Sequence, residues 1–398
     1  EKAMSSIEET GTIKVIETVQ VNYGLTISKE KDIILDLNGK TVTSTIMTDN
    51  SGKLKVIDSS SEKNGGLINT KTYAINNNYG AELIIDSGNI KSTNNFAVYN
   101  NGGNVTINSI KIESDASGLY NMSGTMNIKS ANIKVKNVGI SARGNVIIDD
   151  AEVITESTSL EIYYGNVTIN NGSFNSKRGP ALNNYGSTVT VNDGTFISEN
   201  NYTFYNRDAS GTWSTTHTNV TINGGSFTYL GTSTSYYAIY NDSKMKILGG
   251  TIESKNGYAI FTKNNDLTLG NNDNQVSTTI PIIKGDTYGL YIESGTVSFY
   301  DGVLKGKTNG YYGVINQVEK DYDVSFGTET IDTDEYQIVY LTKITEFVSN
   351  TRTGKKYLDL QLAIDETEEN DFPIIGYKQH NSSSFVWSKD RDKTEKDK

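Results

Sequence analysis

Residues 219–241 read NVTINGGSFTYLGTSTSYYAIYN and contain three short stretches in which apolar and polar residues alternate. Val220 and Ile222 belong to the first stretch, Phe227 to the second, and the motif AIYN closes the third. Alternation with a period of two is typical of β-strands that bury one face. The Asn-Gly-Gly step between the first two stretches is typical of a tight turn. This segment therefore predicts three short strands joined by turns.

The same pattern recurs along the chain in units of about 20 to 25 residues. The motifs that close these units include AINN (74–77), AVYN (97–100), GLYN (118–121), ALNN (181–184) and TFYN (203–206). The order of the three strands never reverses, whereas an antiparallel β-sandwich, the alternative fold, requires hairpins. The sequence therefore predicts an all-β protein, a right-handed single-stranded parallel β-helix of roughly 11–13 coils with three strands per coil.

The two ends of the chain depart from the repeat. We expect residues 1–44 to form an N-terminal cap and the first strands, residues 45–343 the β-helix, and residues 344–398 a C-terminal segment. Within the solenoid, residues 324–344 are expected to form final strands that cover its open end. The C-terminal segment is predicted to begin with a short helix and to end in a solvated tail. The helix is expected to contain Leu358, Leu360, Leu362, Ala363 and Ile364.

The closing motifs predict the orientation of each side chain. The second position is apolar in every unit, so it should face the core, and the fourth position should face inward as well. Buried asparagines need hydrogen-bond partners, and stacked asparagines can supply them to one another. We therefore predict a structural ladder of asparagines at the fourth position: Asn77, Asn100, Asn121, Asn184, Asn206, Asn241 and Asn316.

Positions one and three of these motifs are then expected to face outward. Position one is usually Ala or Gly, and position three is often aromatic. This column favours either a stacking role that protects the sheet or a contact surface for a sugar or a partner. The inserted loop 207–218 is expected to hold Trp213 and His217 over the same face. The candidate ligand-binding residues are Tyr99, Tyr120, Tyr205, Tyr240, Phe261, Tyr291 and Trp213.

Charge and composition narrow the class of partner. The net charge of −11 argues against nucleic acid, whose phosphates require a basic surface, and against an anionic membrane surface. No apolar run is long enough for membrane insertion. The chain has no cysteine, which excludes disulfides and cysteine-based zinc sites and fits a secreted protein that avoids redox chemistry. No metal and no cofactor are expected.

Evidence for catalysis in the sequence is weak. Asp149, Asp150 and Glu152 cluster in one unit and are the only catalytic candidates. Asp149 and Asp150 occupy the same turn position as Asn170 and Asn171, so turn chemistry explains them as well. The chain contains only two histidines, which disfavours a histidine-based triad or metal site.

Two motifs resemble those of known proteins. LDLNGKT (35–41) is similar to the opening of many bacterial surface solenoids, and the stacked asparagines resemble the internal ladder of pectate-lyase-like β-helices. Residues 12–343 thus resemble bacterial cell-surface β-helix proteins of the pectate-lyase-like superfamily. Residues 356–364 are similar to the start of a further solenoid module.

This resemblance implies a location outside the cell, either secreted or on a bacterial surface. The implied function is that of an adhesin or a carbohydrate-binding or structural module without catalytic activity. A polysaccharide lyase or glycoside hydrolase is the alternative, and a pure spacer in a tandem array is a third. The implied partners are a polysaccharide, a host-surface glycan or protein, and neighbouring modules of the same polypeptide.

Overall fold

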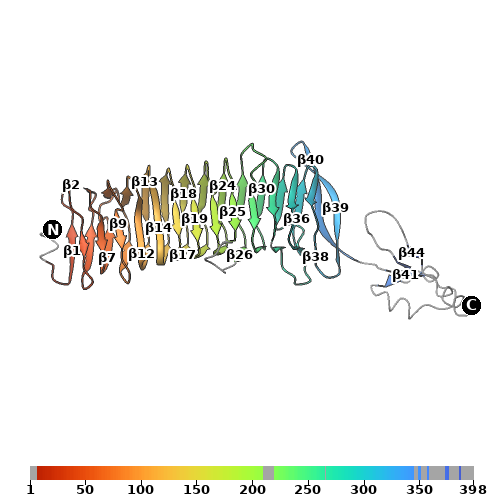
Figure 1. The fold of residues 1–398 in the computed structure, drawn as a ribbon, viewed down its shortest axis with the longest axis horizontal. Helices are drawn as coiled ribbons and strands as arrows, with labels where there is room; N and C mark the ends of the chain where they lie inside the picture. The colour runs from red at the N-terminus through yellow and green to blue at the C-terminus, as the bar shows by residue number, and fades with distance from the viewer. Residues whose placement is uncertain are drawn as a thin grey trace, which may run out of the picture.

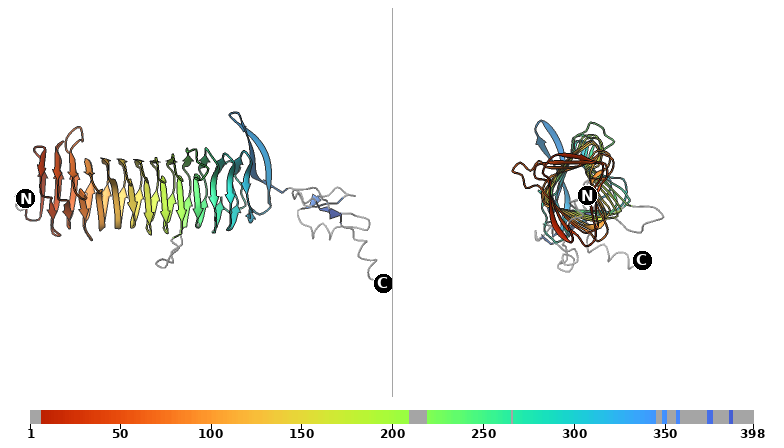
Figure 2. Two further views of the ribbon diagram at one scale, coloured as in Figure 1. Left: turned by 45° about the horizontal axis from the view of Figure 1, so that its top comes forward. Right: turned by 90° about the vertical axis from the view of Figure 1, so that its left-hand side faces the viewer.

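The computed structural model of the protein describes residues 7–208, 219–264 and 266–344, together with the backbone of four short strands between residues 348 and 386. The chain winds as a parallel β-helix of about 14 turns, which Figure 1 shows as a long column of stacked strands. A view along the column shows the strands of successive coils superposed around one interior (Figure 2). The described residues contain no helix, and hence none that could cross a membrane.

Each coil contributes one strand to each of three walls. The first wall contains the NVTI-type strands, which pair in parallel from coil to coil. It also includes the second halves of β12 (Phe96–Ile107) and β14 (Ser117–Ile128). Its remaining strands are β1 (Thr10–Lys14), β4 (Asp32–Asp36), β7 (Lys53–Ile57), β10 (Glu82–Ile85), β17 (Asn145–Ile148), β20 (Asn166–Ile169), β23 (Thr188–Val191), β26 (Asn219–Ile222), β29 (Met245–Ile247), β32 (Leu267–Leu269), β35 (Val297–Phe299) and β38 (Gln317–Val318).

The second wall follows the Asn/Asp-Gly turn. Gly225 adopts a φ of +92° in that turn, a conformation that glycine reaches without strain. The strands of this wall are β2 (Val19–Val21), β5 (Thr41–Ser44), β8 (Gly66–Asn69), β11 (Asn89–Ser92), β13 (Ile110–Ser114), β15 (Ala131–Val135), β18 (Glu152–Thr155), β21 (Ser173–Ser176), β24 (Thr195–Ser198), β27 (Ser226–Tyr229), β30 (Thr251–Ser254), β33 (Ile282–Gly285) and β36 (Val303–Gly306).

The third wall contains the AIYN-type strands and the first halves of β12 and β14. They pair in parallel with like residues aligned, so that Tyr205 lies beside Tyr240 and Asn206 beside Asn241. The remaining strands of this wall are β3 (Thr26–Ile27), β6 (Thr48–Asn50), β9 (Ile75–Asn77), β16 (Ile140–Ala142), β19 (Leu160–Tyr163), β22 (Leu182–Tyr185), β25 (Phe204–Arg207), β28 (Ile239–Asp242), β31 (Tyr258–Thr262), β34 (Tyr288–Ile292) and β37 (Asn309–Tyr312).

The parallel pairing extends further toward the N-terminus than residue 45, where we expected the β-helix to begin. β1 already pairs with β4, and β2 with β5, in the same parallel arrangement as the later coils. These early coils account for the difference between about 14 turns and the 11–13 expected from the repeat. The strands β1 and β2 contain no fully buried residue, unlike the strands of the central coils, so the repeat is harder to recognise there.

An antiparallel hairpin follows the last coil. It is formed by β39 (Tyr322–Ile331) and β40 (Asp334–Lys343), and β40 pairs with β36 of the second wall. The hairpin is the blue pair of long strands in Figures 1 and 2. It places Val339 and Leu341 in the core, so it covers apolar surface that the final coil leaves open. The expected closing strands over 324–344 therefore correspond to this hairpin.

Four short strands follow the hairpin and pair in an antiparallel sheet. They are β41 (Val348–Asn350), β42 (Lys356–Tyr357), β43 (Pro373–Ile375) and β44 (Phe385–Val386). The helix predicted through Leu358 and Ile364 lies outside the described residues.

The core consists of columns of like side chains from successive coils. Phe174, Phe196 and Phe227 stack on the second wall with ring centroids 5.0 and 4.5 Å apart and ring planes within 6° of parallel. All three are fully buried, as are Val220 and Ile222 on the first wall. Full burial of such side chains contributes about 2 kcal/mol each to folding, so these columns supply the main stabilising force.

Buried asparagines form two hydrogen-bonded ladders at the turn after the third wall. In each ladder the amide nitrogen of one asparagine donates to the side-chain oxygen of the asparagine in the following coil, over 2.7 to 2.9 Å. The first ladder contains Asn50, Asn77, Asn100 and Asn121, and the second contains Asn184, Asn206 and Asn241 and ends on the hydroxyl of Thr262. The ladder prediction is thereby confirmed for six residues, and Asn50 joins them.

Ala142 and Ile162 occupy the ladder position in the two coils between the ladders. All donors point toward the C-terminus, so the first asparagine of each ladder lacks a donor for its oxygen. The buried side-chain oxygens of Asn50 and Asn184 accordingly have no partner among the described residues. The prediction for Asn316 was wrong, because that residue is exposed and its side-chain oxygen accepts the amide of Val297 instead.

Asn100 provides a direct test of the ladder. Its amide nitrogen donates to Asn121 and to the carbonyl of Gly103, and its oxygen accepts from Asn77 and from the amide of Gly103. Asn100→Ala leaves buried groups unsatisfied on both neighbouring coils, so it should lower the free energy of unfolding by about 2 to 5 kcal/mol. Asn101→Ala, at the exposed residue that follows Asn100, is the matched control and should cost less than about 1 kcal/mol. Equal thermal midpoints for the two variants would contradict the role of the ladder.

Two buried carboxylates hold the turns near the N-terminal end. Asp58 is 1% exposed and accepts hydrogen bonds from the amides of Gly39, Ser60 and Gly65 at 2.5 to 3.0 Å. Burial raises the pKa of Asp58, but these hydrogen bonds and the Ser60 hydroxyl outweigh it, and its pKa is lowered overall. The pKa of Asp36 is lowered in the same way, by hydrogen bonds from Ser59 and Asn38 that outweigh burial.

These carboxylates predict acid sensitivity. Because the pKa of Asp58 is lower in the folded than in the unfolded state, its stabilising contribution is complete above about pH 5 and is lost progressively as the pH falls further. The thermal midpoint should therefore drop between pH 5 and about pH 2.5. Asp58→Asn should lower the midpoint at pH 7 and reduce this acid dependence, whereas Asp150→Asn, at an exposed turn, should do neither. A wild-type midpoint that is constant over this range would refute the assignment.

Candidate functional site

The outer face of the third wall is aromatic over much of its length. We number the four residues of the AIYN motif one to four and call the residue before it position zero. The side chain at position three projects outward, and the side chain at position zero lies beside that of position three. One or both positions are aromatic in the coils on either side of the middle of this wall. Two aromatic clusters result, and three coils without aromatic residues at either position separate them.

The N-terminal aromatic cluster consists of Tyr73, Phe96, Tyr99 and Tyr120. Tyr73 stacks on Tyr99 with ring centroids 4.4 Å apart and ring planes 10° from parallel. Tyr120 contacts Tyr99 and Phe96 at 5.2 and 5.0 Å in tilted arrangements. Tyr99 and Tyr120 are thus brought together as the sequence predicted.

The C-terminal aromatic cluster is larger and spans five coils. Tyr258 stacks on Tyr291 at 4.4 Å, and Tyr291 stacks on Tyr312 at 4.7 Å, with ring planes within 13° of parallel. Tyr237 lies over Phe261 at 5.2 Å in the same way. The members of the cluster are Tyr202, Tyr205, Tyr237, Tyr240, Tyr258, Phe261, Tyr288, Tyr291 and Tyr312.

The stacking decides which part of each ring meets the solvent. Neighbouring rings cover one another's faces, so ring edges and hydroxyls form most of the accessible surface. Position zero holds Tyr202, Tyr237, Tyr258 and Tyr288 in four consecutive coils, and each is half-buried. Their hydroxyls make no hydrogen bond to any part of the chain that the structure describes. A row of uncommitted hydroxyls therefore follows the solenoid axis.

The hydroxyls of Tyr202, Tyr237 and Tyr258 remain protonated at neutral pH. Burial, together with the neighbouring tyrosines, raises the pKa of Tyr202 to about 12, and burial also raises the pKa of Tyr237 and of Tyr258. A phenol with a raised pKa donates and accepts hydrogen bonds but is a poor general base. These hydroxyls are therefore suited to donating and accepting hydrogen bonds rather than to abstracting protons.

Between the clusters, the outer face of the third wall is polar and cationic. Position three holds Ser141, Glu161 and Asn183 in three successive coils. Tyr163 and Tyr185 lie at position five, the residue after the motif, and are flanked by Arg143 and Arg207. The guanidinium of Arg207 lies 4.6 Å from the ring centre of Tyr205 and 5.4 Å from that of Tyr185.

The first position of the motif does not face outward, contrary to our expectation. Ala97, Ala181, Ala238 and Ala259 are fully buried at this position. The chain bends toward the interior here, and a Cβ at Gly139 would lie only 2.6 Å from the carbonyl oxygen of Ser159 in the next coil. Close approach of successive coils, rather than the floor of a groove, explains the small residues.

The last coil differs from the predicted alignment. Tyr311 pairs with Leu290 and Tyr312 with Tyr291, where the predicted motif GVIN (313–316) would place Val314 and Ile315, so the strand lies three residues earlier than predicted. Val314, predicted to be buried, is 66% exposed, and Tyr312 extends the aromatic cluster instead. Trp213 and His217 lie outside the described residues.

The carboxylates of the proposed catalytic cluster are exposed. The side-chain oxygen of Asp149 accepts from Asn170, which in turn accepts from Asn192, and Asn223 continues this outer ladder. Glu152 accepts from Asn132 at 2.6 Å, and Asp150 and Glu152 line a shallow pocket of about 390 Å³. Asp149 therefore has the turn-stabilising role of the asparagines above it.

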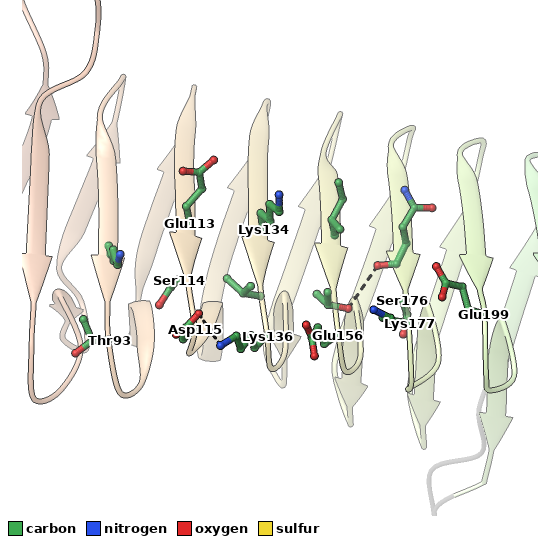
Figure 3. Close-up of a pocket in the computed structure, with 15 residues that line it drawn as sticks. Thr93, Glu113, Ser114, Asp115, Lys134, Lys136, Glu156, Ser176, Lys177 and Glu199 are labelled. Carbon is green, nitrogen blue, oxygen red and sulfur yellow. Dashed lines mark hydrogen bonds and ion pairs between the residues drawn. The ribbon is translucent and has the colours of Figure 1, made fainter.

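A groove of about 730 Å³ crosses the outer face of the second wall, from β11 to the turn after β24 (Figure 3). Its charged residues are Lys91, Glu113, Asp115, Lys134, Lys136, Glu156, Lys177 and Glu199. Three of the four carboxylates have a cation within 3.1 to 3.9 Å: Asp115 pairs with Lys136, Glu113 with Lys111, and Glu156 with Arg178. This groove was not predicted from the sequence, although its charges alternate from coil to coil after each second-wall strand.

No three His, Asp, Glu or Cys side chains gather into a metal-binding group within the described residues. Comparisons with protein families, with curated proteins and with solved structures found no match to this chain. The arrangement of its own side chains therefore carries the functional argument.

The half of the aromatic surface that position zero contributes was not predicted from the sequence either. Position zero is aromatic in six coils, where the sequence reads YAIN, FAVY, YTFY, YAIY, YAIF and YGLY from that residue. The signal was visible in the repeat, but a frame that begins at the small residue leaves it out. These residues are Tyr73, Phe96, Tyr202, Tyr237, Tyr258 and Tyr288.

Proposed function

We propose that the protein is an extracellular, non-catalytic β-helix module that binds an extended glycan along the outer face of its third wall. The observation that carries this proposal is the row of uncommitted tyrosine hydroxyls at position zero of the C-terminal aromatic cluster. Each of four consecutive coils presents one such hydroxyl. The rings beneath them are held by stacking, so little side-chain freedom is lost on binding.

The spacing of this row suits a polysaccharide. Successive coils advance by about 4.8 Å, the distance between hydrogen-bonded strands. A pyranose unit in an extended glycan advances by a similar length, so a chain parallel to the solenoid axis can meet one hydroxyl per sugar. Glycans bind through many weak hydrogen bonds of this kind, because each sugar carries several hydroxyl groups. The net charge of −11 disfavours nucleic acid as the extended ligand.

An extracellular location agrees with the same features. A solenoid of about 14 turns is a rod that displays a periodic surface away from an anchoring point. The absence of cysteine suits an environment in which thiols are oxidised. We include in the proposal that the module acts as an adhesin on a bacterial surface, as its resemblance to surface solenoids implies.

Removal of the hydroxyls alone tests the proposal. In the triple variant Tyr237→Phe/Tyr258→Phe/Tyr288→Phe, the rings and their stacking remain, so the thermal midpoint should change little. Loss of three hydrogen bonds should weaken glycan binding by about 10- to 1,000-fold. Binding is measured by calorimetry with an oligosaccharide first identified on a glycan array.

Tyr23→Phe is the matched control, because Tyr23 is an exposed tyrosine near the other end of the chain. Its affinity for the same oligosaccharide should equal that of the wild type. If the triple variant binds as tightly as the wild type, the row of hydroxyls is not the binding site. If the wild-type protein binds no glycan on a broad array, the proposed function is wrong.

The groove on the second wall favours a second candidate, a polysaccharide lyase or glycoside hydrolase. Carboxylates and lysines from adjacent coils line this groove, and both types of group transfer protons in such enzymes. Lys134 has no ion-pair partner among the described residues, which leaves its amine available to a substrate.

This second candidate predicts release of unsaturated or reducing ends from a polysaccharide panel. Lys134→Ala and Glu113→Gln should then reduce turnover by at least about 100-fold. Lys255→Ala, outside the groove, should leave turnover unchanged. Absence of product from every polysaccharide in the panel would eliminate this candidate.

A further inference from the structure

The polar stretch between the two aromatic clusters has its own recognition chemistry. In four consecutive coils, position five holds Arg143, Tyr163, Tyr185 and Arg207. The two arginines therefore lie on one line along the solenoid axis, three coils apart, which corresponds to about 14 Å. Both belong to the wall that carries the tyrosine hydroxyls.

Neither arginine is neutralised by a carboxylate. The ion pairs among the described residues include Arg178, which lies 3.9 Å from Glu156, but neither Arg143 nor Arg207. The Nε of Arg207 is buried and has no hydrogen-bond partner in the described structure. In a chain with a net charge of −11, two unpaired guanidiniums on one face need an explanation.

Tyrosine rings position both guanidiniums. Arg143 lies 5.6 Å from the ring centre of Tyr163, and Arg207 lies between the rings of Tyr185 and Tyr205. Such contacts hold a guanidinium in place but leave its N–H groups free to donate to a planar anion. An arginine fixed in this way has less entropy to lose when it binds a carboxylate or a sulfate.

The nearest acids have other partners. Glu161 accepts a hydrogen bond from the hydroxyl of Tyr163 at 2.7 Å. Asp242, which is aligned with Arg207 in the next coil, accepts from Asn264 at 2.7 Å. Ser141 and Asn183 are short, polar residues at position three between the arginines, and Ser141 is buried beneath its neighbours.

We propose that Arg143 and Arg207 form an anion-binding site for an acidic glycan, one whose sugars carry carboxylate or sulfate groups. This inference rests on the proposed function, because the arginines lie on the same outer face, five residues along the strands from the tyrosine row, so one glycan reaches both by crossing the third wall obliquely. Each guanidinium binds one anionic group through paired N–H donors. The tyrosine hydroxyls hold the neutral hydroxyl groups, and the arginines supply selectivity for acidic chains.

The experiment compares three oligosaccharides of equal length, one neutral, one carboxylated and one sulfated. The wild-type protein should bind one or both acidic forms about 10- to 100-fold more tightly than the neutral form. Arg143→Gln/Arg207→Gln should remove this preference and leave affinity for the neutral form unchanged. The carboxylated and sulfated forms show which anion the site prefers.

Two further variants complete the test. Arg143→Lys/Arg207→Lys keeps the charge but loses the planar fork, so it should recover only part of the acidic preference. Arg178→Gln, on the second wall, should bind as the wild type does. The thermal midpoint of each variant shows whether the fold is intact.

The outcomes separate this inference from the proposed function. A wild-type protein that binds all three oligosaccharides equally would overturn the arginine site but not the glycan-binding proposal. An unchanged acidic preference in Arg143→Gln/Arg207→Gln would also overturn it. Equal losses for neutral and acidic forms in that variant would show that the arginines only support the tyrosines, which again overturns it. Absence of binding to any form would overturn both.

Discussion

The structure depends on the in-register stacking of one coil on the next through parallel backbone hydrogen bonds. This pairing places equivalent residues of successive units about 4.8 Å apart, so every position in the repeat becomes a column. Columns of apolar residues fill the core, with Phe174, Phe196 and Phe227 stacked almost parallel. A polar side chain buried inside the solenoid must find its hydrogen-bond partners among the equivalent residues of neighbouring coils. The asparagine amide can do this because it is both a donor and an acceptor.

The same constraint organises the outer surface. A residue that faces outward in one coil lies directly against its counterpart in the next, so aromatic side chains at positions zero and three stack along the axis. Stacking fixes the rings but covers their faces, and this favours tyrosine over phenylalanine for contact with a ligand. The hydroxyl of Tyr237 or Tyr258 reaches the solvent from a ring that is otherwise committed. A periodic fold thus produces a periodic set of hydrogen-bonding groups.

Much of the fold could be predicted from the repeat, because burial and alternation leave a clear pattern in the sequence. The core positions of the closing motifs, six ladder asparagines and the pairing of Tyr205 with Tyr240 follow directly from it. The orientation of the first position could not, because it depends on how sharply the chain bends at the corner. The last coil was misaligned by three residues for a related reason: two apolar frames are available, and the hairpin that follows selects one. The contact of Arg207 with Tyr185 joins separate units, so no local pattern encodes it.

On the third wall, the gap in the inner asparagine ladder overlaps with the gap in the outer aromatic column. This overlap has a structural basis. Ala142 and Ile162 interrupt the asparagine ladder in the same coils in which Ser141 and Glu161 replace aromatic residues. A ladder asparagine also holds the turn that follows it, as Asn100 does through the backbone of Gly103. Without that asparagine the turn must be held differently, and after Ile162 the chain instead passes through Tyr164 at a positive φ of 59°. Arg143 and Tyr163 are the first residues of these altered turns. The interruption of the ladder therefore lies within the stretch of the wall that lacks aromatic residues at positions zero and three and that Arg143 and Arg207 border, which is where selectivity between ligands would have to reside.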